Sequence, residues 1–167
     1  MNIFFLSFNP EQCAKWHCDK HVVKMILEIV QMLYTTWHVN DVLPDTAPIC
    51  KSTGNPGYKK AHVNHPMTKW VRESIANYKF AMNLAAALAL EFEYRYGHYH
   101  GCTKHVIWLA SHIPKIDNKE MTPVPQCMPD QYKVVDNPLL AYRKYYIGDK
   151  ISFAKWSKRS PPWWWKK

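Results

Sequence analysis

The segment WHCDKHVVKMILEIVQMLYTTW, residues 16–37, repeats apolar side chains at the spacing of an α-helix. Placed about 100° apart, the apolar side chains gather on one side of the helix; they are Val22, Ile26, Ile29, Val30, Leu33 and Trp37. The polar side chains gather opposite, and they are His17, Lys20, Lys24, Glu28 and Gln31. The pattern predicts an amphipathic helix whose apolar side packs against the core.

Signals before this segment predict where the helix begins. Asn9 can cap a helix N-terminus, Pro10 fits the first helical position, and Gln12 follows three residues after the cap. We therefore expect one helix from Pro10 to about Trp37. Residues 2–8, NIFFLSF, precede it and read as a short strand or a buried extended segment.

The rest of the chain alternates between helical patterns and proline-rich segments. Three more helices are expected: from His65-Pro66 to near Gly97, from Thr103 to before Pro114, and from Asn137-Pro138 to about Lys158. Residues 40–60 and 114–138 contain many prolines and are expected to form long loops.

These elements predict a mainly α fold, a compact single-domain bundle of about four helices with a short N-terminal extended segment and long Pro-rich loops. The domain is expected to span residues 1–167, of which residues 159–167 form a basic, aromatic C-terminal tail. At this length one domain can bury a substantial core.

Charge and composition point to an anionic partner. Lys and Arg total 22 against 13 Asp and Glu, which gives a net charge of +9, and aromatic residues make up 14% of the chain. This excess favours nucleic acid, DNA above all, or a nucleotide as partner; a basic protein that is merely soluble is the alternative. No obligate protein partner and no cofactor are indicated.

Other sequence signals concern the compartment. The five cysteines form no CxxC pair, so they predict reduced thiols and a cytoplasmic location, that of the host cell if a phage encodes the chain. The N-terminus lacks the features of a secretory signal, and no apolar run reaches the roughly 20 residues of a membrane span. We therefore expect no membrane partner.

Asp19 is the polar residue whose position on the helical wheel does not fit, because it points among the apolar side chains. It either accepts hydrogen bonds from a neighbouring loop or pairs with an arginine, or else it is a catalytic acid or base. Lys20 and His21 beside it are the other catalytic candidates. His17 and His21 have the spacing of two metal ligands, but no third ligand is signalled, so no metal site is expected.

Asp130, in PQCMPDQY at residues 125–132, is the fourth catalytic candidate. It lies between proline and tyrosine on a segment that is expected to be rigid, which would hold a carboxylate well for chemistry. An ordinary turn is the alternative.

Two basic segments predict phosphate binding. In YKKAHVNHPMTKW, residues 58–70, a helix N-terminus follows Lys59, His62 and His65 and would favour an anion, unless the segment is only a solvated loop. In AYRKYYIGDKISFAKW, residues 141–156, the candidates are Arg143, Tyr145, Tyr146, Lys150 and Trp156. Cations beside stacking aromatics are typical of nucleic-acid binders, although long basic side chains also extend from apolar edges into solvent.

Several motifs resemble a family of small proteins common in tailed-phage genomes. They are MNIF, HCDKHVVKMILE, the HP followed by Trp at residues 65–70, QCMPDQY, and YRKYYIGDKISFAKW with its Pro-Trp tail. The resemblance covers nearly the whole chain. Some phage proteins that look like this are labelled pyrimidine-dimer DNA glycosylases, so the resemblance implies an enzyme acting on a base in DNA.

The chain departs from that activity at its start. Established pyrimidine-dimer glycosylases attack with the α-amine of an N-terminal threonine that is followed by arginine, whereas this chain begins Met1-Asn2. The classical mechanism therefore does not carry over residue by residue.

The sequence leaves several functions open. The first is a DNA glycosylase or glycosylase/lyase, in which Lys20 or Lys59 forms a Schiff base while Asp19 or Asp130 stabilises charge or activates water. The second is a non-catalytic protein that binds a nucleotide signal or nucleic acid, or inhibits a host defence enzyme. A hydrolytic nuclease is a weaker third. The first two require distant segments to meet in one basic, aromatic pocket.

Overall fold

Six α-helices and one 3₁₀ turn make up the regular structure of residues 1–165, the part of the chain that this computed structural model describes. They are α1 Pro10–Trp16, α2 Asp19–Asn40, α3 Pro66–Val71, α4 Ile75–Tyr96, α5 Thr103–Ser111, η1 Asp130–Tyr132 and α6 Pro138–Lys150. Within this range the only β-type pairing is an isolated bridge between Ile49 and Pro56. The predicted mainly α fold is confirmed.

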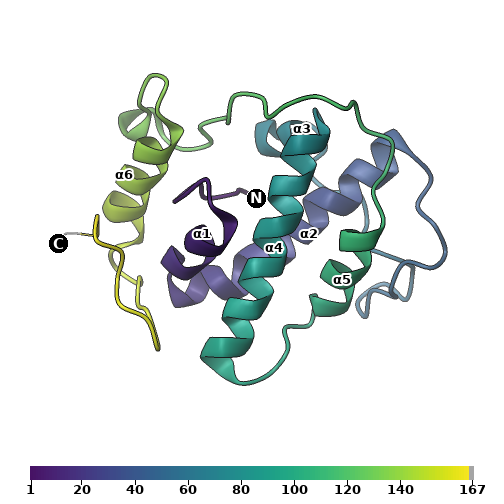
Figure 1. The fold of residues 1–167 in the computed structure, drawn as a ribbon, viewed down its shortest axis with the longest axis horizontal. Helices are drawn as coiled ribbons and strands as arrows, with labels where there is room; N and C mark the ends of the chain where they lie inside the picture. The colour runs from purple at the N-terminus through teal and green to yellow at the C-terminus, as the bar shows by residue number, and fades with distance from the viewer. Residues whose placement is uncertain (166–167) are drawn as a thin grey trace.

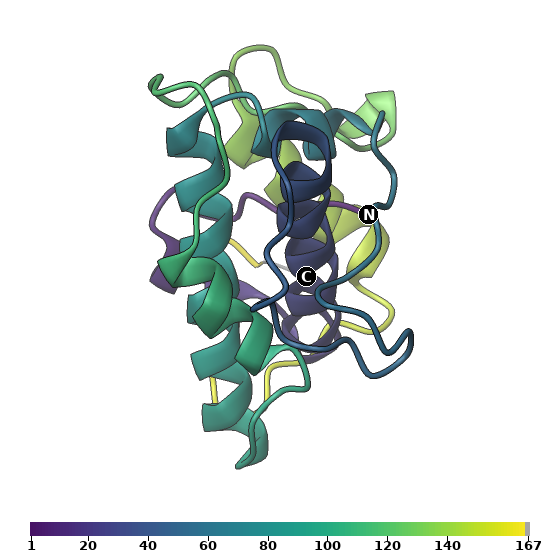
Figure 2. The ribbon, with the colours of Figure 1, turned by 90° about the vertical axis from the view of Figure 1, so that its right-hand side faces the viewer.

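α4 is the central helix, and α1, α2, α3 and α5 pack against it (Figure 1). α6 lies on the far side of α1 and of the N-terminal segment, and residues 112–137 run over the top of the molecule from α5 to α6. The loop between α2 and α3 lies beside α5, as Figure 2 shows. No helix of the described residues is long and apolar enough to cross a membrane.

The first expected helix is divided in two. Asn9 caps α1 as predicted, and its side chain accepts a hydrogen bond from Gln12 N at 2.8 Å. The chain then becomes extended at His17 and Cys18 before α2 begins. The break leaves the carbonyl of His17 free to accept a hydrogen bond from Arg95 at 2.9 Å. The spacing of apolar residues carries no information about this hydrogen bond, so it could not predict the break at His17.

The second expected helix is also divided, between α3 and α4. Ser74 caps α4 by accepting a hydrogen bond from Asn77 N. The buried Asn77 side chain donates to the carbonyl of Trp70 at 2.7 Å, so a carbonyl at the end of α3 is satisfied without a continuous helix. Gly97 ends α4 in a left-handed conformation, close to the predicted end.

The last helix ends at Lys150 rather than near Lys158, because the chain turns there and crosses the junction of α1 and α2. The carbonyl of Lys155 accepts a hydrogen bond from Asp19 N at 2.8 Å. Further on, Arg159 donates to both carboxylate oxygens of Glu91 at 2.9 Å. The chain after α6 therefore docks on the helices.

The N-terminal segment is extended and buried but forms no strand. Residues 3–6 are at most 5% exposed. Instead of pairing with a strand, the carbonyl of Leu6 accepts two hydrogen bonds from the Arg143 guanidinium, at 2.9 and 3.1 Å. Because α6 holds this segment, residues far apart in sequence come together around Phe4.

Two glycines in the loop between α2 and α3 allow a test of how tightly the loop packs. Both have positive φ, but a Cβ on Gly57 would lie 2.6 Å from the Tyr34 ring, whereas a Cβ on Gly54 would meet nothing within 4 Å. We expect Gly57→Ala to lower the free energy of unfolding by about 2–4 kcal/mol, and Gly54→Ala by about 1 kcal/mol. Denaturant titration measures both. Equal losses would contradict the packing of Gly57 against Tyr34.

Candidate functional site

An aromatic cluster between α2 and α6 contains several of the predicted site residues. The Phe4 ring stacks on His21 on one side, with centroids 4.6 Å apart, and on Tyr145 on the other, at 5.8 Å. Tyr146 meets the edges of Phe4 and His21, and Phe153 meets the edge of His21. We call these five residues the α2–α6 cluster.

Two lysines border the α2–α6 cluster. The ammonium of Lys150 lies 4.5 Å from the Tyr145 ring centroid and 5.9 Å from that of Phe4. The ammonium of Lys20 lies 4.9 Å from the Phe153 ring centroid. Lys20, at the start of α2, and Lys150, at the end of α6, thus lie against the same group of aromatic rings. The face of an aromatic ring attracts a cation.

Sequence reasoning missed Phe4 and Phe153. The sequence predicts a short strand or a buried extended segment over residues 2–8, but the contact partners of Phe4 depend on how α6 docks. Phe153 was assigned to the interior of a longer helix, whereas it lies in the turn after α6, where its ring packs on His21.

Histidines 17 and 21 are both buried and both neutral near pH 7. Burial lowers the pKa of His17 to about 4, with a smaller contribution from Arg95. Burial also lowers the pKa of His21 to about 3, helped by His17, Lys150 and Lys24. The prediction that His17 lies on the polar side of the helix is wrong, because His17 sits in the break before α2 and is fully buried.

Asp19 has the partners expected of a structural carboxylate. It accepts hydrogen bonds from the backbone N–H of Ser157 at 2.9 Å and from its hydroxyl at 2.8 Å. It also forms an ion pair with Arg95 at 2.9 Å. Both the loop and the arginine foreseen for the structural alternative are present, and the catalytic role of Asp19 stays a prediction.

Asp130 lies apart from Asp19. Its side chain is 94% exposed on η1 and pairs with Lys133 at 2.7 Å, and that pairing lowers the pKa of the carboxyl. The Asp130 carboxylate is exposed to solvent, and its partner is Lys133 rather than another catalytic candidate. This geometry fits the alternative of an ordinary turn.

The first basic segment is largely solvent-exposed. Lys59 and His62 are exposed on the chain before α3. His65 caps α3 by accepting a hydrogen bond from Met67 N at 3.2 Å, so one N–H that could receive an anion is occupied. α3 is also only six residues long. This geometry fits the alternative of a solvated loop better than that of a built anion site.

Arg143 and Trp156 use their polar groups within the chain. The guanidinium of Arg143, which binds Leu6, also lies over the rings of Trp16, Trp163 and Trp164, at 5.2–5.6 Å. Trp156 donates its indole N–H to the carbonyl of Trp16 at 3.0 Å. In this arrangement they hold the tail against α1.

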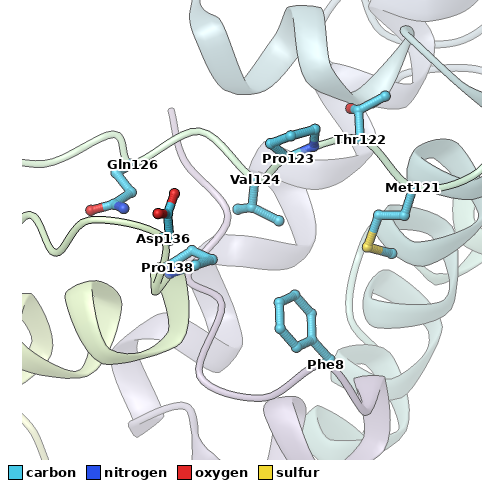
Figure 3. Close-up of a pocket in the computed structure, with 8 residues that line it drawn as sticks. All are labelled: Phe8, Met121, Thr122, Pro123, Val124, Gln126, Asp136 and Pro138. Carbon is cyan, nitrogen blue, oxygen red and sulfur yellow. The ribbon is translucent and has the colours of Figure 1, made fainter.

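The predicted residues do not line a common hollow among the five pronounced ones on the described surface. One of about 460 Å³, drawn in Figure 3, lies between Phe8, residues 121–126 and the start of α6. None of these five hollows therefore joins the candidate segments, and their convergence on one cavity stays a prediction. What does converge is the α2–α6 cluster with its two lysines.

Within residues 1–165, no three His, Cys, Asp or Glu side chains gather closely enough to hold a metal ion. No family model, curated protein or solved structure matches the chain.

The contacts of Asp19 predict that it stabilises the fold. We expect Asp19→Asn to lower the free energy of unfolding by about 2 kcal/mol, because buried Arg95 loses a charged partner and Ser157 a charged acceptor. Asp130→Asn is the matched control and should leave stability unchanged. Denaturant titration measures both variants, and equal stability of the two would contradict the role assigned to Asp19.

The buried histidines predict a loss of stability in mild acid. The unfolded chain binds protons on both below pH 6.5, whereas the folded chain excludes them down to about pH 4 and 3. The free energy of unfolding is therefore highest above pH 6.5 and falls as the pH drops. At pH 5 it is lower by about 2 kcal/mol for each of these histidines. Urea titrations at pH 7 and pH 5 measure this loss.

His21→Phe should reduce the loss at pH 5 by about 2 kcal/mol, because Phe keeps the ring packing and cannot be protonated. His62→Asn alters an exposed histidine in a left-handed conformation that Asn adopts readily, so it should keep the wild-type dependence. A wild-type stability that is the same at both pH values would show that these imidazoles are protonated in the folded state.

Proposed function

We propose that this protein binds single-stranded DNA through the surface formed by Lys20, Tyr145, Lys150 and Phe153, here called the Lys20–Lys150 face. The observation that supports it is that two ammonium groups from opposite ends of the chain border one set of aromatic rings. Lysine binds phosphate, and partly exposed rings stack on unpaired bases, so the face offers both contacts that a strand requires.

The charge around this face favours an anion. Lys155 lies beside it, because its carbonyl binds Asp19 at the start of α2. Neither Lys20 nor Lys155 forms an ion pair with any acid in residues 1–165. Lys150 pairs with the exposed Asp149 at 2.6 Å. The Lys150 side chain is 14% exposed, and its ammonium also donates to the Tyr145 hydroxyl at 3.3 Å, so a phosphate would replace Asp149 on the exposed side of this lysine.

The rings of the Lys20–Lys150 face favour unpaired bases over a duplex. Tyr145 and Phe153 are partly exposed, and Tyr132 extends the aromatic surface beside Tyr145, with centroids 5.2 Å apart. Every base has a face that can stack on such rings, whereas bases inside a duplex are already stacked. A nucleotide is a smaller ligand of the same chemistry.

Binding without catalysis is the better supported of the two leading functions. A glycosylase/lyase needs an accessible amine beside a carboxylate that is available to the substrate. Lys20 supplies the amine, but Asp19 is occupied by Arg95 and Ser157, and Asp130 is paired with Lys133. The resemblance to tailed-phage proteins supports DNA as the partner and the host cytoplasm as the location, and both stay proposals.

Salt dependence of binding tests the proposal. With a fluorescent single-stranded oligonucleotide, Lys20→Gln and Lys150→Gln should each reduce the slope of log affinity against log salt concentration by about 1, because each removes one phosphate contact. Tyr145→Leu should weaken binding about tenfold with little change of slope, because it removes stacking and no charge. Fluorescence anisotropy measures both quantities.

Lys79→Gln is the matched control, since Lys79 is exposed on α4 and away from the Lys20–Lys150 face. It should bind like the wild type. The proposal fails if this control loses as much slope as Lys20→Gln, or if the wild type shows no affinity at low salt. Borohydride treatment with abasic DNA should trap no adduct; an adduct that disappears in Lys20→Gln would establish the lyase instead.

A further inference from the structure

A second hollow, of about 350 Å³, lies on another part of the molecule and is lined by the loop that joins α2 to α3 and by the start of α5. Its lining is rich in groups that react or titrate, among them Cys50, Ser52, Tyr58, Cys102, Lys104 and His105. The proposed binding of DNA makes no use of these residues. Two of them are cysteines that lie far apart in sequence and face one space.

Cys50 is held in a tight turn that brings hydrogen-bond donors to its sulfur. The backbone N–H of Cys50 donates to the carbonyl of Asn55, and its carbonyl accepts from the N–H of Gly54, both at 2.9 Å. The turn places the hydroxyl of Ser52 3.2 Å from the Cys50 sulfur. A hydroxyl at this position can donate to a thiolate and stabilise it.

The surroundings of Cys50 act differently from those of the other cysteines. Burial works to raise the pKa of the Cys50 thiol, but hydrogen bonds from Ser52 and Thr53 outweigh it and lower that pKa. Burial prevails at the other four, raising the pKa of Cys13, Cys18, Cys102 and Cys127. Since the thiolate is the reactive form, Cys50 is the cysteine best prepared to react.

A positive charge lies next to this turn. The ammonium of Lys104 donates to the carbonyl of Ile49, the residue before Cys50, at 2.6 Å. Electropositive surroundings of this kind are typical of reactive cysteines. The lysine comes from α5, so the reactive setting depends on the loop docking against that helix.

Cys102 supplies a second thiol that lines the same hollow. Its sulfur lies 3.3 Å from the hydroxyl of Tyr58. Cys50 lies close enough for its charge to raise the pKa of the Cys102 thiol. Cys102 therefore stays protonated while Cys50 is activated, as expected of a thiol that reacts second.

We propose that Cys50 is a peroxide-reactive thiol and that Cys102 resolves its oxidised form into a disulfide. The Cys50 thiolate attacks one peroxide oxygen, the O–O bond breaks, and hydroxide leaves and takes up a proton to become water. Cys50 is then a sulfenic acid. The Cys102 thiol attacks this sulfur, the S–S bond forms, the S–O bond breaks, and the hydroxyl leaves with the thiol proton as a second water.

The size of the opening favours a small oxidant. Cys50 is only 2% exposed although it lines the hollow, so a peroxide of two oxygen atoms reaches its sulfur more easily than a bulky reagent does. The disulfide would fasten the loop between α2 and α3 to the N-terminal end of α5. The proposal is independent of DNA binding, so either can fail without the other.

Peptide mapping after hydrogen peroxide treatment tests the proposal. The wild type should form a Cys50–Cys102 disulfide, and Cys102→Ser should instead accumulate a sulfenic acid on Cys50 that dimedone traps. Cys50→Ser should form neither product, and its oxidation should slow at least tenfold. Cys127→Ser, which alters a partly buried cysteine outside the hollow, should behave like the wild type.

Circular dichroism establishes that each variant is folded, and Cys50→Ala provides a second variant if the serine perturbs the turn. Dimedone labelling of Cys13, Cys18 or Cys127 ahead of Cys50 in the folded wild type would overturn the proposal. So would an oxidation rate that Cys50→Ser and Cys50→Ala leave unchanged, or a sulfenic acid on Cys50 that persists in the wild type without a disulfide.

Discussion

The side chain of Arg95, fully buried near the end of α4, holds the parts of this fold together. Its guanidinium donates to Glu91 at 2.7 Å and to Asp19 at 2.9 Å, and also to the carbonyls of His17 and Lys15. One cation therefore fixes the end of α1, the break and the start of α2. Arginine suits this position because its planar group presents several donors in fixed directions.

The same network positions the candidate site. Glu91 and Asp19 bind Arg95 on one side and the chain after α6 on the other, through Arg159 and Ser157. The chain after α6 is thereby drawn across the junction of α1 and α2. This route places Phe153 against His21 and beside Lys20, so that the Lys20–Lys150 face forms only when the tail is docked.

The sequence predicted the helical class and the starts of α1, α3, α5 and α6, because caps such as Asn9 and the apolar spacing along the chain are local signals. It could not predict the breaks at His17 and before Ser74, since these depend on partners from distant segments, Arg95 and Thr122 among them. For the site, the position of Asp19 among the apolar side chains of the helix correctly predicted that its carboxylate needs a partner. Local patterns could not show that Arg143 and Trp156 bind the chain itself, or that Lys59 and His62 face solvent, because both depend on how distant segments pack.

The stability of an Arg95→Met variant tests the central role of this arginine most directly. Removing the guanidinium leaves Glu91 and Asp19 without their shared partner in a buried setting. We predict that the free energy of unfolding falls by about 3–5 kcal/mol. A fall below about 1 kcal/mol, the range of an exposed ion pair, would mean that the break before α2 and the docked tail do not depend on Arg95.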